Sequence, residues 1–283
     1  RERPFKLLAQ RTIGYVRGDS ILPVGLEGSF NEVLGGDKGR QLMLRVPGDY
    51  YIPVSDLAEI EPEAGNDLVT TLDINIQDVA EHSLLEACET HDADHGCAIV
   101  MEVKTGAIRA MANIGRTEDG WWETYNYAVG ERVEPGSMFK LASFMSMMED
   151  GYIDDLEQKV PVYGGKVKVY NEELRDDIAH GLDSMTIRQV FAQSSNVGTA
   201  TMMQQCYKAN SMGFISRLEQ FRLHQPVGIE IGGEEPPIIK NPKNAKSDWS
   251  GTTLPWMSIG YELLLTPLQL LTFFNAVAND GRA

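Results

Sequence analysis

A serine and a lysine three positions apart are the first candidates for chemistry in this chain. Ser137 and Lys140 lie in the segment EPGSMFKLAS, residues 134–143. Proline and glycine interrupt regular structure just before the serine and an apolar run follows, so the segment predicts the opening of a buried helix. Residues three apart share one face of a helix, which places the lysine amine beside the serine hydroxyl.

This pair has the components of nucleophilic catalysis. A serine hydroxyl is a weak nucleophile until a base removes its proton. A lysine in an apolar setting loses its charge more readily and can act as that base. The pattern alone is weak evidence, because a chain of 283 residues is expected to contain about one Ser-x-x-Lys by chance. Its position at a helix opening favours the chemical interpretation.

A second polar group stands downstream, at Ser194-Ser195-Asn196. It interrupts two predicted helices and is expected to form a short turn. The hydroxyl of Ser194 could pass a proton between a lysine and a leaving nitrogen, and the carboxamide of Asn196 could hold a substrate amide. Ser-x-Asn is a common pattern that also occurs at residues 29–31. There Ser29 is interpreted as a helix cap.

Composition and charge exclude several other classes of function. The formal net charge of -16 argues against nucleic acid, because phosphate binding requires a clustered basic surface. No stretch approaches the roughly twenty apolar residues of a membrane helix, and the N-terminus does not resemble a signal peptide. The three cysteines and five histidines lack metal-ligand spacing, so we expect neither a metal nor a cofactor. Because the first residue is Arg1, the chain is expected to be part of a longer protein.

The elements that must position these residues fall in two predicted regions. Residues 1–65 are rich in glycine, proline and short alternating runs, which predicts strands and loops with one short helix near 29–34. A linker at 61–66 suggests a boundary between a domain 1–65 and a domain 66–283. The second domain is predicted to hold a strand at 68–72, hairpins at 97–113 and near 160–169, and helices at 74–88 (capped by Asp73), 137–150, 184–192, 199–207, 212–221 and 266–279.

Taken together, these motifs resemble the penicillin-binding protein transpeptidase family, most closely its class B, division-type members. Ser137-x-x-Lys140 and, 57 positions after Ser137, Ser194-x-Asn196 are similar to the family's first two motifs. Further segments that carry the resemblance, in family order, are 25–30, 72–77, 102–112, and 258–261 with 266–270.

The family's third motif, Lys-Thr-Gly, is not found where it should stand. Lys104-Thr105-Gly106 spells it but precedes Ser137, whereas in the family it comes last, on the strand at the edge of the site. We interpret Lys104 as part of an exposed hairpin turn. The chain ends at Ala283, ahead of that motif. Since losing one oxyanion donor typically costs about 10² to 10³ in rate, the chain by itself is expected to be weak or inactive.

The resemblance implies an α+β fold, in which a β-rich pedestal precedes a helix–sheet–helix transpeptidase domain like that of serine β-lactamases. Here that domain lacks its last strands, so its sheet should have an unpaired edge. The implied activity is that of a peptidoglycan D,D-transpeptidase. In it Ser137 is the nucleophile, Lys140 the general base and Ser194 the proton relay, while Asn196 binds the substrate.

The implied partners are stem peptides ending in D-Ala-D-Ala, β-lactam antibiotics, a membrane glycosyltransferase and other division proteins. The implied location is the periplasmic face of the cytoplasmic membrane, with an N-terminal anchor that this chain lacks. Two alternatives stay open. One is a β-lactam sensor or β-lactamase of the same superfamily, which would generally lack a region like 1–65. The other is a non-catalytic division scaffold.

Overall fold

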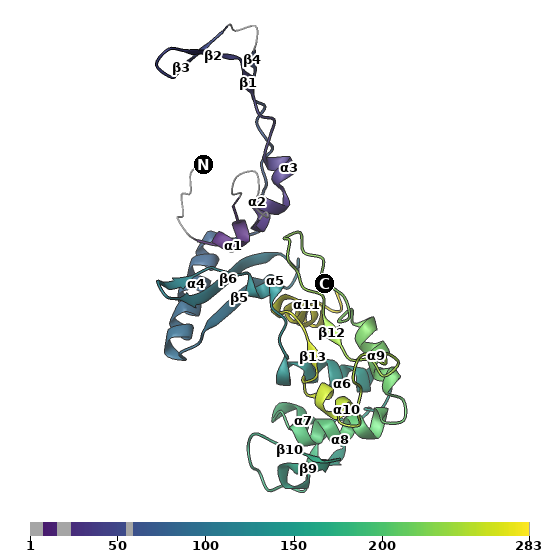
Figure 1. Cartoon of the computed structure of the whole chain (residues 1–283). Coiled ribbons are helices and arrows are strands. Elements are labelled where there is room, and N and C mark those ends of the chain that lie inside the picture. The colour runs from purple at the N-terminus through teal and green to yellow at the C-terminus, as the bar shows by residue number, and fades with distance from the viewer. Residues whose placement is uncertain (1–7, 16–23, 55–58, 283) are drawn as a thin grey trace. The chain divides into compact units, whose positions relative to one another are not determined.

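The computed structural model describes residues 8–15, 24–54 and 59–282. The chain forms two compact units, which Figure 1 shows as ribbons. The first comprises residues 1–102, 107–126 and 229–233, and the second comprises 103–106, 127–228 and 234–283. The predicted boundary at residues 65 and 66 falls inside the first unit. As a boundary between family domains it stays a prediction.

The first part of the first unit consists of short elements. Three helices, α1 (Gln10–Ile13), α2 (Gly25–Ser29) and α3 (Asn31–Leu34), replace the single helix expected near 29–34. Ser29 ends α2 and does not cap a helix; its hydroxyl accepts a hydrogen bond from the Gly232 N–H at 2.9 Å. Expected strands are present in the antiparallel pairs β1 (Arg40–Gln41) with β4 (Glu59–Ile60) and β2 (Met43–Val46) with β3 (Tyr50–Pro53).

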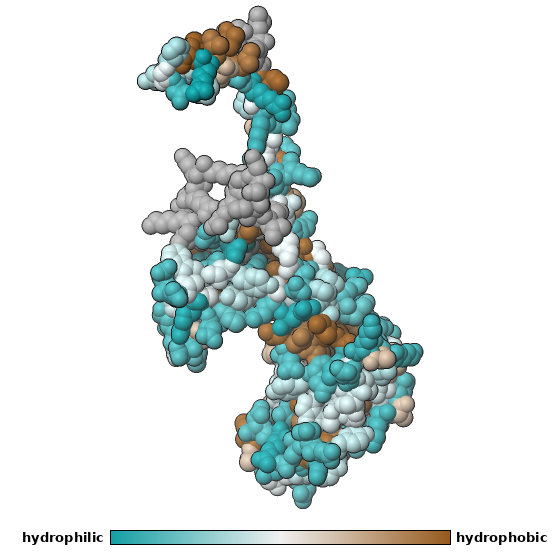
Figure 2. Space-filling view, in the orientation of Figure 1, coloured by the Kyte–Doolittle hydropathy of each residue, from teal (hydrophilic) through white to brown (hydrophobic). Residues whose placement is uncertain are grey.

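The β2–β3 hairpin carries apolar side chains in solvent, which are brown in Figure 2. Leu44 is 54% exposed and Tyr50 is 71% exposed. Because these side chains are exposed, they add little buried apolar area to the described structure.

A three-stranded antiparallel sheet and one long helix complete the first unit. The sheet has the order β5 (His95–Met101), β6 (Ile108–Thr117), β7 (Gly120–Trp122), and among the described strands β5 pairs only with β6. Helix α4 (Ile74–Thr90) packs on β5 and β6. Asp73 caps α4, as expected, by accepting hydrogen bonds from the N–H groups of Asn75 and Ile76. Gln77 of α4 bonds both the N–H and the carbonyl of Met111 in β6.

The strand predicted at 68–72 is wrong. The segment is irregular because side chains, not a backbone ladder, attach it to β6. The Thr71 hydroxyl donates to the Ile108 carbonyl, and the Arg109 guanidinium donates to the Thr71 carbonyl.

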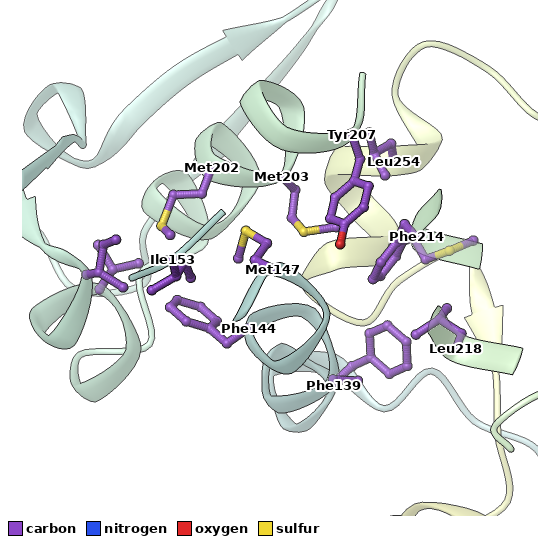
Figure 3. Close-up of a cluster of buried hydrophobic side chains, with 14 of the residues drawn as sticks. Phe139, Phe144, Met147, Ile153, Met202, Met203, Tyr207, Phe214, Leu218 and Leu254 are labelled. Carbon is purple, nitrogen blue, oxygen red and sulfur yellow. The ribbon is translucent and has the colours of Figure 1, made fainter. Parts of the chain in front are cut away.

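Helices build the core of the second unit, around α6 (Lys140–Glu149). A 3₁₀ turn, η3 (Gly136–Phe139), leads into α6. Figure 3 shows large side chains from several helices meeting there, and the buried members include Phe139, Phe144, Met147, Met203, Tyr207, Phe214 and Leu218. The Tyr207 hydroxyl also donates to the Ser146 carbonyl at 2.9 Å, which joins α8 to α6 within the core.

Two of the remaining helices begin with clear local signals, whereas two others, at Tyr127–Gly130 and Thr253–Ser258, lie where the sequence predicted no helix. Thr186 and Gln189 form a capping box at the start of α7 (Ile187–Ala192), and Thr266 and Gln269 form another at α11 (Pro267–Ala278). The other helices are α5 (Tyr127–Gly130), α8 (Asn196–Tyr207), α9 (Ser211–Gln220) and α10 (Thr253–Ser258).

Short strand pairs lie beside these helices. The hairpin predicted near 160–169 is wrong in its pairing, because β8 (Lys159–Pro161) pairs with β11 (Ser184–Thr186) and β9 (Lys166–Val169) pairs with β10 (Glu172–Arg175). The helix expected from residue 184 begins only at Ile187, since β11 occupies the preceding residues. A third pair joins β12 (Ile238–Ile239) and β13 (Leu263–Leu264), and η4 (Tyr163–Gly165) precedes β9. No helix in the described ranges is long and apolar enough to cross a membrane.

Candidate active site

Ser137 lies in the η3 turn, which the backbone of a later segment holds in place. The Gly136 N–H donates to the Gly260 carbonyl at 3.1 Å. A Cβ on Gly260, whose φ is +89°, would lie 1.9 Å from the Gly136 carbonyl oxygen, so only glycine fits there. The Glu134 carboxylate accepts a hydrogen bond from the Glu262 N–H at 2.8 Å. The turn that presents Ser137 is therefore held by two hydrogen bonds with the segment 260–262.

Lys140 is the first residue of α6, and its side chain points to the Ser194 turn. The residue is only 2% exposed. Its Nζ donates to the Ser194 carbonyl at 2.5 Å, to Ser194 Oγ at 2.9 Å and to Asn196 Oδ1 at 2.7 Å. Three of the four predicted site residues thus lie in direct contact, although Lys140 and Ser194 are 54 positions apart in the chain.

Burial lowers the pKa of Lys140 below that of an exposed lysine. Desolvation lowers the pKa of Lys140 from 10.5 to about 8, while the charges of Asp176 and Asp177 act in the opposite direction. A lysine with such a pKa is neutral in an appreciable fraction of molecules near neutral pH, and neutral lysine can accept a proton.

The fourth predicted residue, Ser137, is accessible to a substrate. It is exposed, and its hydroxyl makes no hydrogen bond with any residue that the structure describes. It occupies the turn immediately before α6, three positions ahead of Lys140. The predicted contact between the lysine amine and the serine hydroxyl is not among the hydrogen bonds of the described residues, since the amine is turned to Ser194 and Asn196.

Ser194 lies in the expected turn, but Asn196 does not. Ser194 lies in the turn after α7 with a φ of +54°, an uncommon value for a residue other than glycine. Asn196, however, is already the first residue of α8 and not part of a turn, because Ser195 caps that helix. The Asn196 Nδ2 donates to the Arg175 carbonyl at 2.9 Å, so both ends of this carboxamide have partners.

The sequence did not single out Asp176 and His180, which lie behind this turn. Their side chains are 5% and 12% exposed, and His180 Nε2 lies in hydrogen-bond contact with Asp176 Oδ2 at 2.8 Å. Two residues four apart in a loop give no signal in a single sequence, and only the fold shows the contact of Asp176 with Ser195.

The other matches to the motifs lie elsewhere. Lys104 is exposed in the turn between β5 and β6, as expected, and Ser29 belongs to the first unit. In the described part of the chain, no group of three or more His, Cys, Asp or Glu side chains could hold a metal ion.

Comparison with known proteins identifies the family. The model of the penicillin-binding protein transpeptidase domain matches residues 96–283. Penicillin-binding protein PbpB of Mycobacterium tuberculosis is 31% identical over 295 residues, covering 99% of this chain and 41% of that protein. Peptidoglycan D,D-transpeptidase FtsI of Escherichia coli is 24% identical over 280 residues, covering 95% and 44%. The chain thus spans less than half the length of these relatives.

Solved structures agree with the sequence comparison. The crystal structure of penicillin-binding protein 3 from Mycobacterium tuberculosis in complex with aztreonam superimposes with a TM-score of 0.77 at 29% identity, over 99% of this chain and 58% of that one. The predicted α+β fold of a penicillin-binding transpeptidase is confirmed. Because the family model matches most of its length, this chain belongs to the penicillin-binding protein transpeptidase family, among the class B, division-type members.

Proposed function

We propose that the protein carrying this chain is a peptidoglycan D,D-transpeptidase that works through an acyl-enzyme on Ser137. One observation carries the proposal. Lys140, three positions after an exposed serine, is buried with a pKa lowered to about 8 and contacts Ser194 and Asn196. A nucleophile, a base and a relay are the groups that acyl transfer requires.

In the acylation step, Lys140 accepts the proton of the Ser137 hydroxyl. The serine oxygen bonds to the carbonyl carbon between the two terminal D-alanines of a stem peptide. The C–N bond then breaks, the leaving nitrogen receives a proton from Lys140 through Ser194, and D-alanine departs. The product is an ester of Ser137 with the shortened stem. Asn196 holds the substrate amide, and the Ser137 N–H at the start of its helix is one donor to the oxyanion.

The second step forms the cross-link. An amine of a neighbouring stem attacks the ester carbonyl, and its proton passes to the base. The bond to the serine oxygen breaks, and Ser137 recovers a proton. A β-lactam enters the first step in the same way, but its leaving nitrogen stays attached through the opened ring. The acyl-enzyme then persists.

The setting of the reaction is proposed from the relatives. Relatives carry the name FtsI, and a solved neighbour holds aztreonam. We propose a role in septal cell-wall synthesis at the periplasmic face of the cytoplasmic membrane, where a membrane glycosyltransferase and other division proteins are partners. β-Lactam antibiotics are the proposed inhibitors.

Labelling of the full-length protein with a fluorescent penicillin tests the proposal. We expect a labelled band that disappears in Ser137→Ala and weakens strongly in Lys140→Ala and Ser194→Ala. The chain offers matched controls: Lys104→Ala and Ser29→Ala alter the same residue types in motif look-alikes and should keep full labelling. Continued labelling of Ser137→Ala refutes the assignment.

Two further readouts separate the alternatives. Rapid hydrolysis of a chromogenic cephalosporin would favour a β-lactamase. Growth rescue by a full-length Ser137→Ala allele would favour a scaffold without catalysis.

A further inference from the structure

A buried carboxylate lies directly behind the turn that carries Ser194. Asp176 follows β10, and its side chain is 5% exposed. Its Oδ1 accepts a hydrogen bond from the Val197 N–H at 2.9 Å. Its Oδ2 accepts from the Ser195 hydroxyl at 2.9 Å and from His180 Nε2 at 2.8 Å. A carboxylate with this many donors is firmly held, because hydrogen bonds to a charged acceptor are the strong ones.

These bonds attach the start of α8 to the end of β10. Ser195 caps α8 by accepting from the Gly198 N–H at 2.9 Å while it donates to Asp176. The preceding residue, Arg175, offers its carbonyl to Asn196 at 2.9 Å. The negative charge of Asp176 also lies at the N-terminal end of α8, where the helix dipole favours it. Ser194 and Asn196 flank Ser195 and are therefore held with it.

The hydrogen bonds of His180 fix its tautomer. Its Nδ1 accepts from the Leu182 N–H at 3.0 Å, so the proton of the neutral ring is on Nε2 and is donated to Asp176. The carboxylate lies between Ser195 and His180, so the three residues are not arranged as a serine–histidine–aspartate relay. Ser195 is a structural donor here and not a second nucleophile.

We propose that Asp176 is a positioning residue for acyl transfer, which holds Ser194 and Asn196 against Lys140 through the Ser195 hydroxyl and the Val197 N–H. The proposal rests on the function proposed above. Asp176 does not touch the reacting atoms, and no salt bridge joins it to Lys140 among the described residues.

Asp176 also acts on Lys140 through its charge, and this separates it from a merely structural residue. The charges of Asp176 and Asp177 raise the pKa of Lys140 against the desolvation that lowers it. Asp177 is exposed and shares this electrostatic effect, but it makes none of the hydrogen bonds to the turn. Asp177→Asn is therefore a matched control that removes a charge and leaves the positioning contacts intact.

The test measures acylation of the full-length protein by a penicillin as a function of concentration and pH. In Asp176→Asn the new amide hydrogens face the Nε2–H of His180, so the turn loses its alignment. We expect the limiting acylation rate to fall about tenfold to a hundredfold, since an ångström of misplacement can cost about a hundredfold. The concentration for half-maximal rate should change little. The acid limb of the pH profile should move to lower pH.

In Asp177→Asn, the acid limb should move in the same direction while the limiting rate stays at the wild-type value. Ser195→Ala, which removes one of the donors to Asp176, should lower the limiting rate by a smaller factor. This variant decides the matter if Asp176→Asn does not fold. A wild-type limiting rate in Asp176→Asn, or in Ser195→Ala where only that variant folds, overturns the positioning role. An unlabelled wild-type protein would instead overturn the proposed function itself, and the positioning role with it.

Discussion

The pKa of Lys140 makes a quantitative prediction for the rate of acylation as a function of pH. With a pKa of about 8, roughly 9% of the lysine is neutral at pH 7, about 1% at pH 6 and about half at pH 8. At the ordinary value of 10.5, only about 0.03% would be neutral at pH 7. Burial in the core thus raises the amount of free base about 300-fold at neutral pH.

If Lys140 removes the proton of Ser137, the second-order acylation rate follows the neutral fraction. We expect a rise of nearly tenfold from pH 6 to pH 7, and less than a twofold rise from pH 8 to pH 9. Rapid-quench acylation of the full-length protein with a penicillin that has no group titrating between pH 6 and 10 measures the profile.

Lys104→Ala provides the control and should reproduce the wild-type profile, because Lys104 is exposed in a turn. A profile that is flat from pH 6 to 8 would show that no buried base is titrating. An inflection near pH 10 would show that the lysine is not desolvated in the working enzyme. Either result refutes the reasoning.

Three further predictions concern stability. The pKa of Lys140 is lowered from 10.5 to about 8, so between pH 8 and 10.5 the unfolded state binds more protons than the folded state. The free energy of unfolding of the wild type should therefore rise with pH across this window, by up to about 3 kcal/mol. Denaturant unfolding of Lys140→Met should lack that rise. Gly260→Ala would place a Cβ 1.9 Å from the Gly136 carbonyl oxygen. It should lower the free energy of unfolding by about 2 kcal/mol or more and weaken penicillin labelling. The control Gly281→Ala, at positive φ in open space, should lower the melting temperature less. Burial raises the pKa of Glu123 from 4.5 to about 7. The stability that this group contributes below pH 4.5 is therefore lost as the pH rises through 7, by roughly 3 kcal/mol at most. In Glu123→Gln, the free energy of unfolding measured from pH 4 to 8 should vary less than in the wild type.

Elements with strong local signals were predictable from the sequence. The start of helix α11 has two local signals, a capping box of Thr266 and Gln269 and a proline, Pro267, in the first turn. Both are present in the structure. Asp73 marks the start of α4 as its N-cap residue. The segment 68–72 shows the limit of this approach. Its β-branched residues suggested a strand, but Thr71 bonds through its side chain and the backbone ladder does not form.

The candidate site shows the same division between local and distant information. The spacing of Ser137 and Lys140 is local, and it correctly places both residues at a helix opening. The burial of Lys140 is not local, because its contacts lie 54 and 56 positions further along the chain. The contact between Asp176 and Ser195 likewise joins two positions that no sequence period relates.

The opposing influences on Lys140 explain why carboxylates lie near a buried lysine at all. Desolvation alone would push the pKa of Lys140 further down, and a base with a very low pKa takes a proton from serine poorly. The charges of Asp176 and Asp177 oppose that shift and leave the pKa near 8. In the proposed mechanism the same amine must return the proton to the leaving nitrogen, and a pKa close to the working pH suits both transfers. Since Asp176 also holds the Ser194 turn, one buried carboxylate links the position of the relay to the proton affinity of the base.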